Sequence, residues 1–164
     1  MTVQHHFREE KYFDSSTHVL QHREAAKSSI ASIEEVQKCM NLTKSYLESQ
    51  LNLPCLILCN WAIDTALKTL YMKDYKRVYP PCSLSLDELL DLTRDSHGNR
   101  DLGTVNFIEC IRFIVNSPDM MQFQRMEEEH LVKMIRRADT LVSELYGKCY
   151  EGYGAVVGYQ RVFS

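Results

Sequence analysis

The sequence predicts an all-α protein, an up-and-down bundle of about five helices with an extended C-terminal tail. Six glycines and four prolines in 164 residues are too few for a turn-rich β-sandwich. Apolar residues make up 45% of the chain and charged residues 25%, which is the composition of a globular protein with its own core. Along most of the chain, apolar side chains recur at steps of three and four, the period of an amphipathic helix.

The length suits a single domain. We expect a polar N-terminal arm over residues 1–19, a helical bundle over 20–150, and a tail over 151–164 that lies extended over the bundle or against a partner subunit. The formal net charge of -3 excludes a protein that is basic overall, so any contact with nucleic acid would be local. The first residues lack the apolar core of a secretory signal, and the apolar run 53–63 is short for a membrane span. The expected location is therefore the cytoplasm.

The first predicted helix covers residues 21–50, with one apolar face formed by Ala26, Ile30, Ile33, Val36, Met40 and Leu47. Asn52-Leu53-Pro54 marks a break and a new start, because Asn caps helices and Pro is tolerated in the first turn. The second helix should run to about residue 74. It is apolar on nearly every side, which places it at the centre of the bundle.

The remaining helices are predicted from their start signals and periods. Ser85-Leu86-Asp87-Glu88 is a capping box, so a short helix should begin at Leu86. A polar loop over 95–103 precedes a helix with apolar residues from Phe107 to Val115. Ser117-Pro118-Asp119 is a start signal for the last helix, which should end between residues 147 and 152.

The second helix resembles the corresponding helix of HEPN domains, which shows a run of the type A-x-x-A-x-E-x-A-L-K-A-L. Ala62, Ala66, Leu67, Lys68 and Leu70 match that run. The segment 85–90 resembles the H-D-L-x-x-L-L run that usually follows, with Ser and Leu in place of His and Asp. The resemblance covers about residues 22–147. It implies a small helical bundle that usually dimerises, in a family that includes toxin–antitoxin RNases and non-catalytic partners of nucleotidyltransferases.

HEPN RNases resemble one another in an Arg-x(4–6)-His motif, and Arg125 and His130 have that spacing. Imidazole can act as general acid or base on a ribose 2′-hydroxyl, and a guanidinium can hold the scissile phosphate. Three features oppose a catalytic role. On a regular helix the two side chains are about 140° apart, and three glutamates between them repel phosphate. His130 also falls on the predicted apolar stripe, between Met126 and Met134, which favours a packed or interface histidine.

Asn60, Asp64 and Lys68 form the one polar stripe of the second helix and are the candidate binding residues. Asn60 and Asp64 could orient His130 or Arg125 across the bundle, or Asp64 and Lys68 could form an ordinary surface ion pair. Trp61 beside them is a core residue in one interpretation and a stacking platform for a base or partner in the other.

The six cysteines have no zinc-ligand spacing, so we interpret them as free thiols that act as small apolar side chains. No metal and no cofactor is expected. Three functional hypotheses follow. The first is a HEPN-like binding module, a homodimer associated with nucleotide or RNA and with a nucleotidyltransferase or antitoxin partner. The second is a metal-independent endoribonuclease that uses Arg125 and His130. The third is a non-catalytic assembly or scaffold protein.

Overall fold

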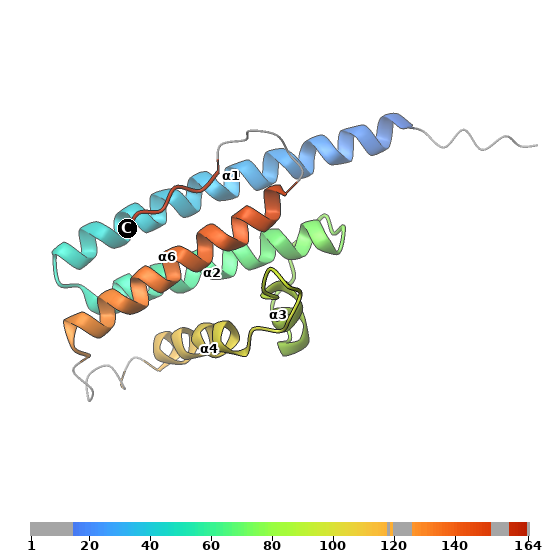
Figure 1. Cartoon of the computed structure of the whole chain (residues 1–164). Coiled ribbons are helices and arrows are strands. Elements are labelled where there is room, and N and C mark those ends of the chain that lie inside the picture. Colours follow the sequence, from blue (N-terminus) through green and yellow to red (C-terminus); the bar gives the residue numbers. More distant parts are fainter. Residues whose placement is uncertain (1–14, 118, 120–125, 152–157, 164) are drawn as a thin grey trace, which may run out of the picture.

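The structure is a computed structural model that describes residues 15–117, 119, 126–151 and 158–163, with side chains from residue 31 onward. Within these residues it contains helices and no strand, which confirms the all-α class. The five helices are α1 (Ser15–Glu48), α2 (Asn52–Asp74), α3 (Leu86–Leu92), α4 (Leu102–Asn116) and α6 (Glu128–Tyr150) (Figure 1).

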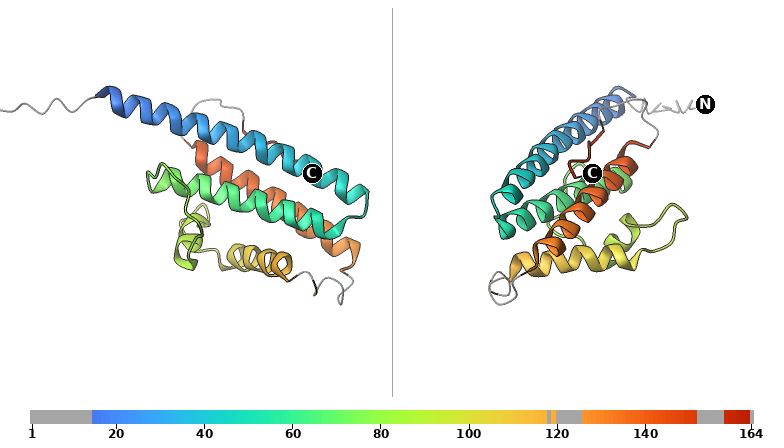
Figure 2. Two further views of the ribbon diagram at one scale, coloured as in Figure 1. Left: turned by 180° about the vertical axis from the view of Figure 1, so that it is seen from behind. Right: turned by 60° about the vertical axis from the view of Figure 1, so that its left-hand side comes forward.

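The long helices alternate in direction along the chain, as Figures 1 and 2 show from three sides. Helix α2 packs against α1, α6, α4 and α3, so it is the central helix, as its apolar sequence predicted. Its buried side chains include Leu56, Ile63 and Leu67. By length and composition α2 could also cross a membrane, although the apolar run within it looked too short for this. Half of its most apolar window is buried inside the bundle.

The short helix α3 begins where the capping box predicted. Ser85 Oγ accepts a hydrogen bond from the backbone N–H of Glu88, and a Glu88 carboxylate oxygen accepts one from the Ser85 N–H. Lys148 of α6 holds the other end of α3, because its Nζ donates to the carbonyl oxygens of Leu92, at 3.2 Å, and Arg94, at 2.5 Å. These carbonyls have no partner within the helix, so the lysine supplies one.

The last helix begins later than predicted. Met126 and Glu127 are not helical, and α6 starts at Glu128, ten residues after the Pro118 start signal. Two of the three glutamates lie in the first turn of α6, where the helix dipole favours negative charge. Residues 120–125 lie outside the described part of the chain. Helix α1 also begins earlier than predicted, at Ser15, within the segment assigned to the polar arm.

Residues 158–163 lie extended in the space between α1 and α6 (Figures 1 and 2). The sequence left open whether the tail lies over the bundle or against a partner subunit. Residues 158–163 lie on the bundle of their own chain. Three of the six cysteines, Cys55, Cys59 and Cys149, are buried as predicted, whereas Cys82 and Cys110 are exposed.

Candidate functional site

The central helix carries a partly exposed stripe that includes two large, exposed apolar side chains. Ile57, Trp61, Asp64 and Lys68 are spaced by four, three and four residues, so they lie on one face of α2. Trp61 is 42% exposed and Ile57 is 44% exposed. The interpretation of Trp61 as a core residue is therefore wrong. We call these four residues the α2 stripe.

An ion network closes one end of the α2 stripe. Asp64 pairs with Lys68, at 2.7 Å between Nζ and Oδ2, which is the surface pair that the sequence left open. Arg112 of α4 approaches Asp64 to 3.5 Å and pairs with Glu109 at 2.8 Å. The network contains two acidic and two basic side chains, so their formal charges cancel. The arrangement, an indole and an isoleucine beside paired charges, is suited to contact with another surface.

Asn60 and His130, the remaining sequence candidates within the described residues, do not join this network. Asn60 is half-buried on α2. Of the two alternatives for Asp64, the link to His130 is not formed, because Asp64 is paired with Lys68 and Arg112 whereas His130 Nδ1 is 3.4 Å from a Glu127 carboxylate oxygen.

His130 is in the first turn of α6, and its side chain is 65% exposed. The interpretation of His130 as a packed residue is therefore wrong. The buried face of α6 is instead the neighbouring stripe that contains Leu131, Ile135 and Ala138. Helix α6 begins at Glu128, so Arg125 and His130 do not lie on one regular helix. The angle of about 140° between their side chains, which assumed such a helix, therefore does not apply. Arg125 itself lies outside the described residues.

A buried carboxylate on α6 was not predicted from the sequence. Asp139 is 0% exposed. It accepts hydrogen bonds from the Tyr159 hydroxyl at 2.5 Å, the Val162 N–H at 3.0 Å and the Phe163 N–H at 2.9 Å. Burial and the neighbouring Asp139 raise the pKa of Tyr159 far above its ordinary value, so its hydroxyl stays a donor. An acidic residue within the apolar face of α6 was the signal that could have found this site.

A second buried polar group joins α1, α2 and α6. The Tyr146 hydroxyl lies 2.7 Å from Ser32 Oγ, which lies 2.9 Å from Thr69 Oγ1. Burial raises the pKa of Tyr146 to about 12. These hydroxyls satisfy one another inside the core, so they align three helices and do not form a reactive site.

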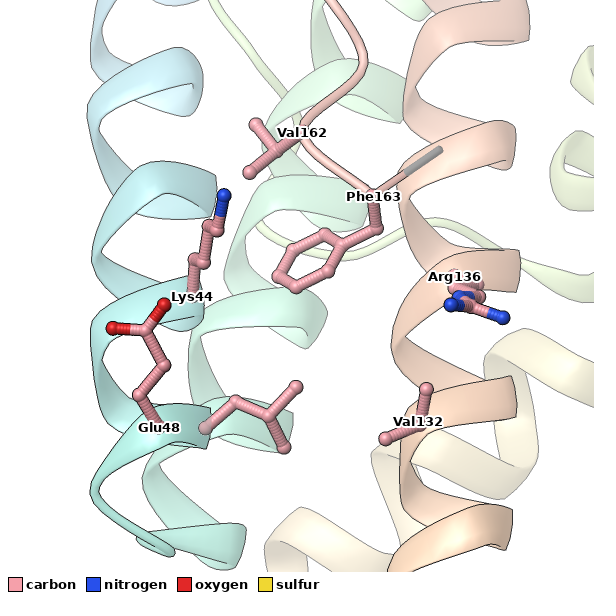
Figure 3. A pocket seen from close by; sticks show the side chains of 7 residues that line it. Lys44, Glu48, Val132, Arg136, Val162 and Phe163 are labelled. Carbon is pink, nitrogen blue, oxygen red and sulfur yellow. The ribbon is translucent and has the colours of Figure 1, made fainter.

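A pocket of about 290 Å³ adjoins the end of the extended segment. It opens between α1 and α6, with Phe163 pointing into the space between the two helices (Figure 3). Its lining is apolar in the centre and charged at the rim: Lys44, Leu47, Glu48, Val132, Arg136, Val162 and Phe163. Among the described residues, no group of three His, Cys, Asp or Glu side chains is placed to hold a metal ion.

The fold and these surfaces define the class of the protein as an all-α helical bundle. Comparison of the chain with family models, with curated proteins and with solved structures finds no match.

Proposed function

We propose that the chain is a helical-bundle interaction module that pairs with a second copy through the α2 stripe and acts as a nucleotide- or RNA-associated partner protein. The observation that carries this proposal is the exposure of Trp61 and Ile57 on the helix that otherwise forms the centre of the core. The HEPN resemblance of the same helix supports both the pairing and the association with nucleotide or RNA.

The chemistry of the α2 stripe agrees with a protein interface. Tryptophan and arginine are the residue types that most often dominate binding energy at interfaces. Here Trp61 lies on α2 and Arg112 on the neighbouring α4, and the Arg112 guanidinium approaches Asp64 of α2. Burial of the Trp61 and Ile57 side chains against a partner would remove apolar surface from water, and the ion network would form the polar rim.

Trp61 is the one tryptophan in the chain, so its fluorescence reports on this surface directly. We expect the emission maximum to shift to shorter wavelength as protein concentration rises, in step with dimer formation measured by analytical ultracentrifugation. Replacement Trp61→Ala should weaken dimerisation at least about tenfold, as interface hot spots do. The matched control is Tyr79→Ala, which removes an exposed aromatic ring from the loop after α2. A dimer unchanged by Trp61→Ala, or no dimer in the unaltered chain, would contradict the proposal.

Association with nucleotide or RNA is tested on the same protein by titration with a mixed-sequence RNA and with ATP at low and high salt. Electrostatic contacts should weaken as salt rises. If neither ligand binds the dimer, the assembly or scaffold hypothesis replaces the RNA-associated one.

Endoribonuclease activity is the second candidate, and the exposure of His130 favours it. An exposed imidazole beside the Glu127 carboxylate is accessible to an RNA 2′-hydroxyl. This candidate predicts cleavage of mixed-sequence RNA in EDTA by the unaltered protein and a loss of at least about a hundredfold with His130→Ala, the effect of a general acid or base. The control is His97→Ala, in an exposed loop. Equal cleavage by all three proteins, or none by any of them, would exclude His130 as a catalytic residue.

A further inference from the structure

The segment 158–163 lies in a groove whose walls are α1 and α6. Both helices pack on α2, and the segment lies between them. We call this space the α1–α6 groove. Gln37 on the α1 wall and Asp139 and Tyr146 on the α6 wall contact the segment. These side chains bind its main chain and one of its side chains.

The α1 wall binds the segment through Gln37. Its Nε2 donates to the Gln160 carbonyl oxygen at 2.9 Å, and its Oε1 accepts from the Gln160 N–H at 2.9 Å. One amide side chain therefore pairs with both main-chain groups of one residue, as a neighbouring β-strand would. No side-chain identity is required of the occupant at this position.

The α6 wall binds the segment through Asp139. A carboxylate without solvent contact is costly unless hydrogen bonds compensate it. The Tyr159 hydroxyl and the N–H groups of Val162 and Phe163 provide that compensation. The Arg161 guanidinium adds a charge 3.7 Å from Oδ2. An occupant of this wall must therefore present a hydroxyl and two successive N–H groups.

The side chains of the segment set its register. The Tyr159 ring is buried and stacks on the Tyr146 ring, with centroids 6.2 Å apart. Val162 and Phe163 pack against the core cluster, and Phe163 reaches the pocket of about 290 Å³. In Figure 3 the Phe163 ring points between Lys44 and Glu48 on one helix and Val132 on the other. The groove therefore selects a tyrosine, a main-chain contact, and an apolar residue followed by phenylalanine.

We propose that the α1–α6 groove is a peptide-recognition site for an extended Tyr-x-x-Val-Phe segment, occupied by residues 159–163 of the same chain and open to the identical segment of a second copy. The other occupant that the groove fits is this segment of a second copy, because the groove requires a tyrosine hydroxyl, a main-chain pair and an aromatic ring four residues after the tyrosine, and every copy of this chain carries that combination. This site is separate from the α2 stripe and does not depend on it.

The first experiment uses the unaltered chain labelled with ¹⁵N and an unlabelled synthetic peptide, Gly-Tyr-Gln-Arg-Val-Phe. We expect the amide signals of Val162 and Phe163 to move to the positions of a released segment. Half-displacement should need peptide on the order of millimolar, the effective concentration of a short tethered segment. A peptide with Phe in place of Tyr should be at least tenfold weaker, because it lacks the hydroxyl. Signals that do not move at a tenfold higher peptide concentration would overturn the proposal.

The second experiment releases the resident segment in the full chain with Tyr159→Ala and Phe163→Ala. This variant should bind the labelled peptide at least tenfold more tightly than the unaltered chain, and addition of Asp139→Asn should abolish the gain. Gln160→Ala is the control without effect, since Gln37 contacts only main-chain atoms there. Circular dichroism establishes that each variant is helical. If the released variant is folded and does not bind, the proposal is wrong, and if it does not fold, the labelled unaltered chain decides.

A mixing experiment tests the second copy itself. The Asp139→Asn chain has an intact segment and an impaired groove, and the released variant has the converse. With Trp61→Ala in both, to remove the α2 stripe from the assay, we expect a heterodimer only in the mixture. Failure of the α2 stripe proposal would leave this result unchanged. A mixture that stays monomeric while the peptide binds would restrict the groove to its own chain and overturn the second-copy assignment.

Discussion

At the scale of single residues, buried polar side chains join segments that are far apart in the sequence. Tyr146 joins three helices through Ser32 and Thr69, and Asp139 holds the extended segment. Neither was assigned a role from the sequence. The acidic residue within the apolar face of α6 marked Asp139 as unusual, but the partners of both residues lie far along the chain and no local pattern identifies those partners. Asp64 and Lys68 could be predicted as a pair, since a spacing of four residues on a helix brings them together.

The buried Tyr146 hydroxyl should lower the free energy of unfolding at alkaline pH. Burial raises its pKa from 10.0 to about 12, and burial raises that of Cys149 from 9.0 to about 12. Because both pKa values are higher in the folded state, their stabilisation is complete below about pH 9 and is lost as the pH rises toward 12. Urea unfolding at pH 8 and 11 should give a lower free energy at pH 11. Tyr146→Phe should reduce this decrease, and an equal decrease in both proteins would rule out the tyrosine as a source.

At the scale of elements, local signals predicted α2 and α3 well and the last helix poorly. The Asn-Leu-Pro segment predicts the start of α2 and the capping box predicts the start of α3, each within a few residues. Both helix starts could therefore be predicted from local sequence. The apolar period continues through Met126, His130 and Met134 and therefore suggested an unbroken helix. Glu128 and Glu129 favour the first turn of a new helix, where the helix dipole stabilises negative charge. The spacing of apolar residues carries no information about this charge effect, so it did not predict the new start.

The capping box of α3 gives a direct test at this scale. Ser85→Ala removes the side chain that accepts from the Glu88 N–H, and a lost cap lowers the free energy of unfolding by about 1 kcal/mol. The matched control is Ser83→Ala, an exposed serine two residues before the cap. Urea unfolding of the three proteins checks the prediction. A difference between the two variants of less than about 0.3 kcal/mol would mean that Lys148 alone maintains α3.

At the scale of the whole molecule, the bundle follows from its most apolar helix. Because α2 is apolar on nearly all sides, other helices must cover it, and that requirement predicted the central position. The exposure of Trp61 and the docking of residues 158–163 did not follow from the pattern. Both depend on which faces are covered after the helices pack.

Gln37 links two parts of the chain that are 123 positions apart. Gln37→Ala removes both hydrogen bonds to the main chain of Gln160, so we expect the free energy of unfolding to fall by about 1 kcal/mol. Gln160→Ala keeps both bonds and should change it by less than about 0.5 kcal/mol. Thermal or urea unfolding measures the difference. Equal effects of the two substitutions would show that the Gln37 pair adds nothing to stability.

The Asp139 site also implies an order of events during folding. Residues 158–163 follow the described helices in the chain, so the bundle can pack before they dock, with the Asp139 carboxylate still facing water. The carboxylate loses its hydration only when the Tyr159 hydroxyl and the two N–H groups arrive. A chain whose helices have packed and whose segment has not yet docked therefore has a hydrated Asp139 carboxylate and a vacant groove.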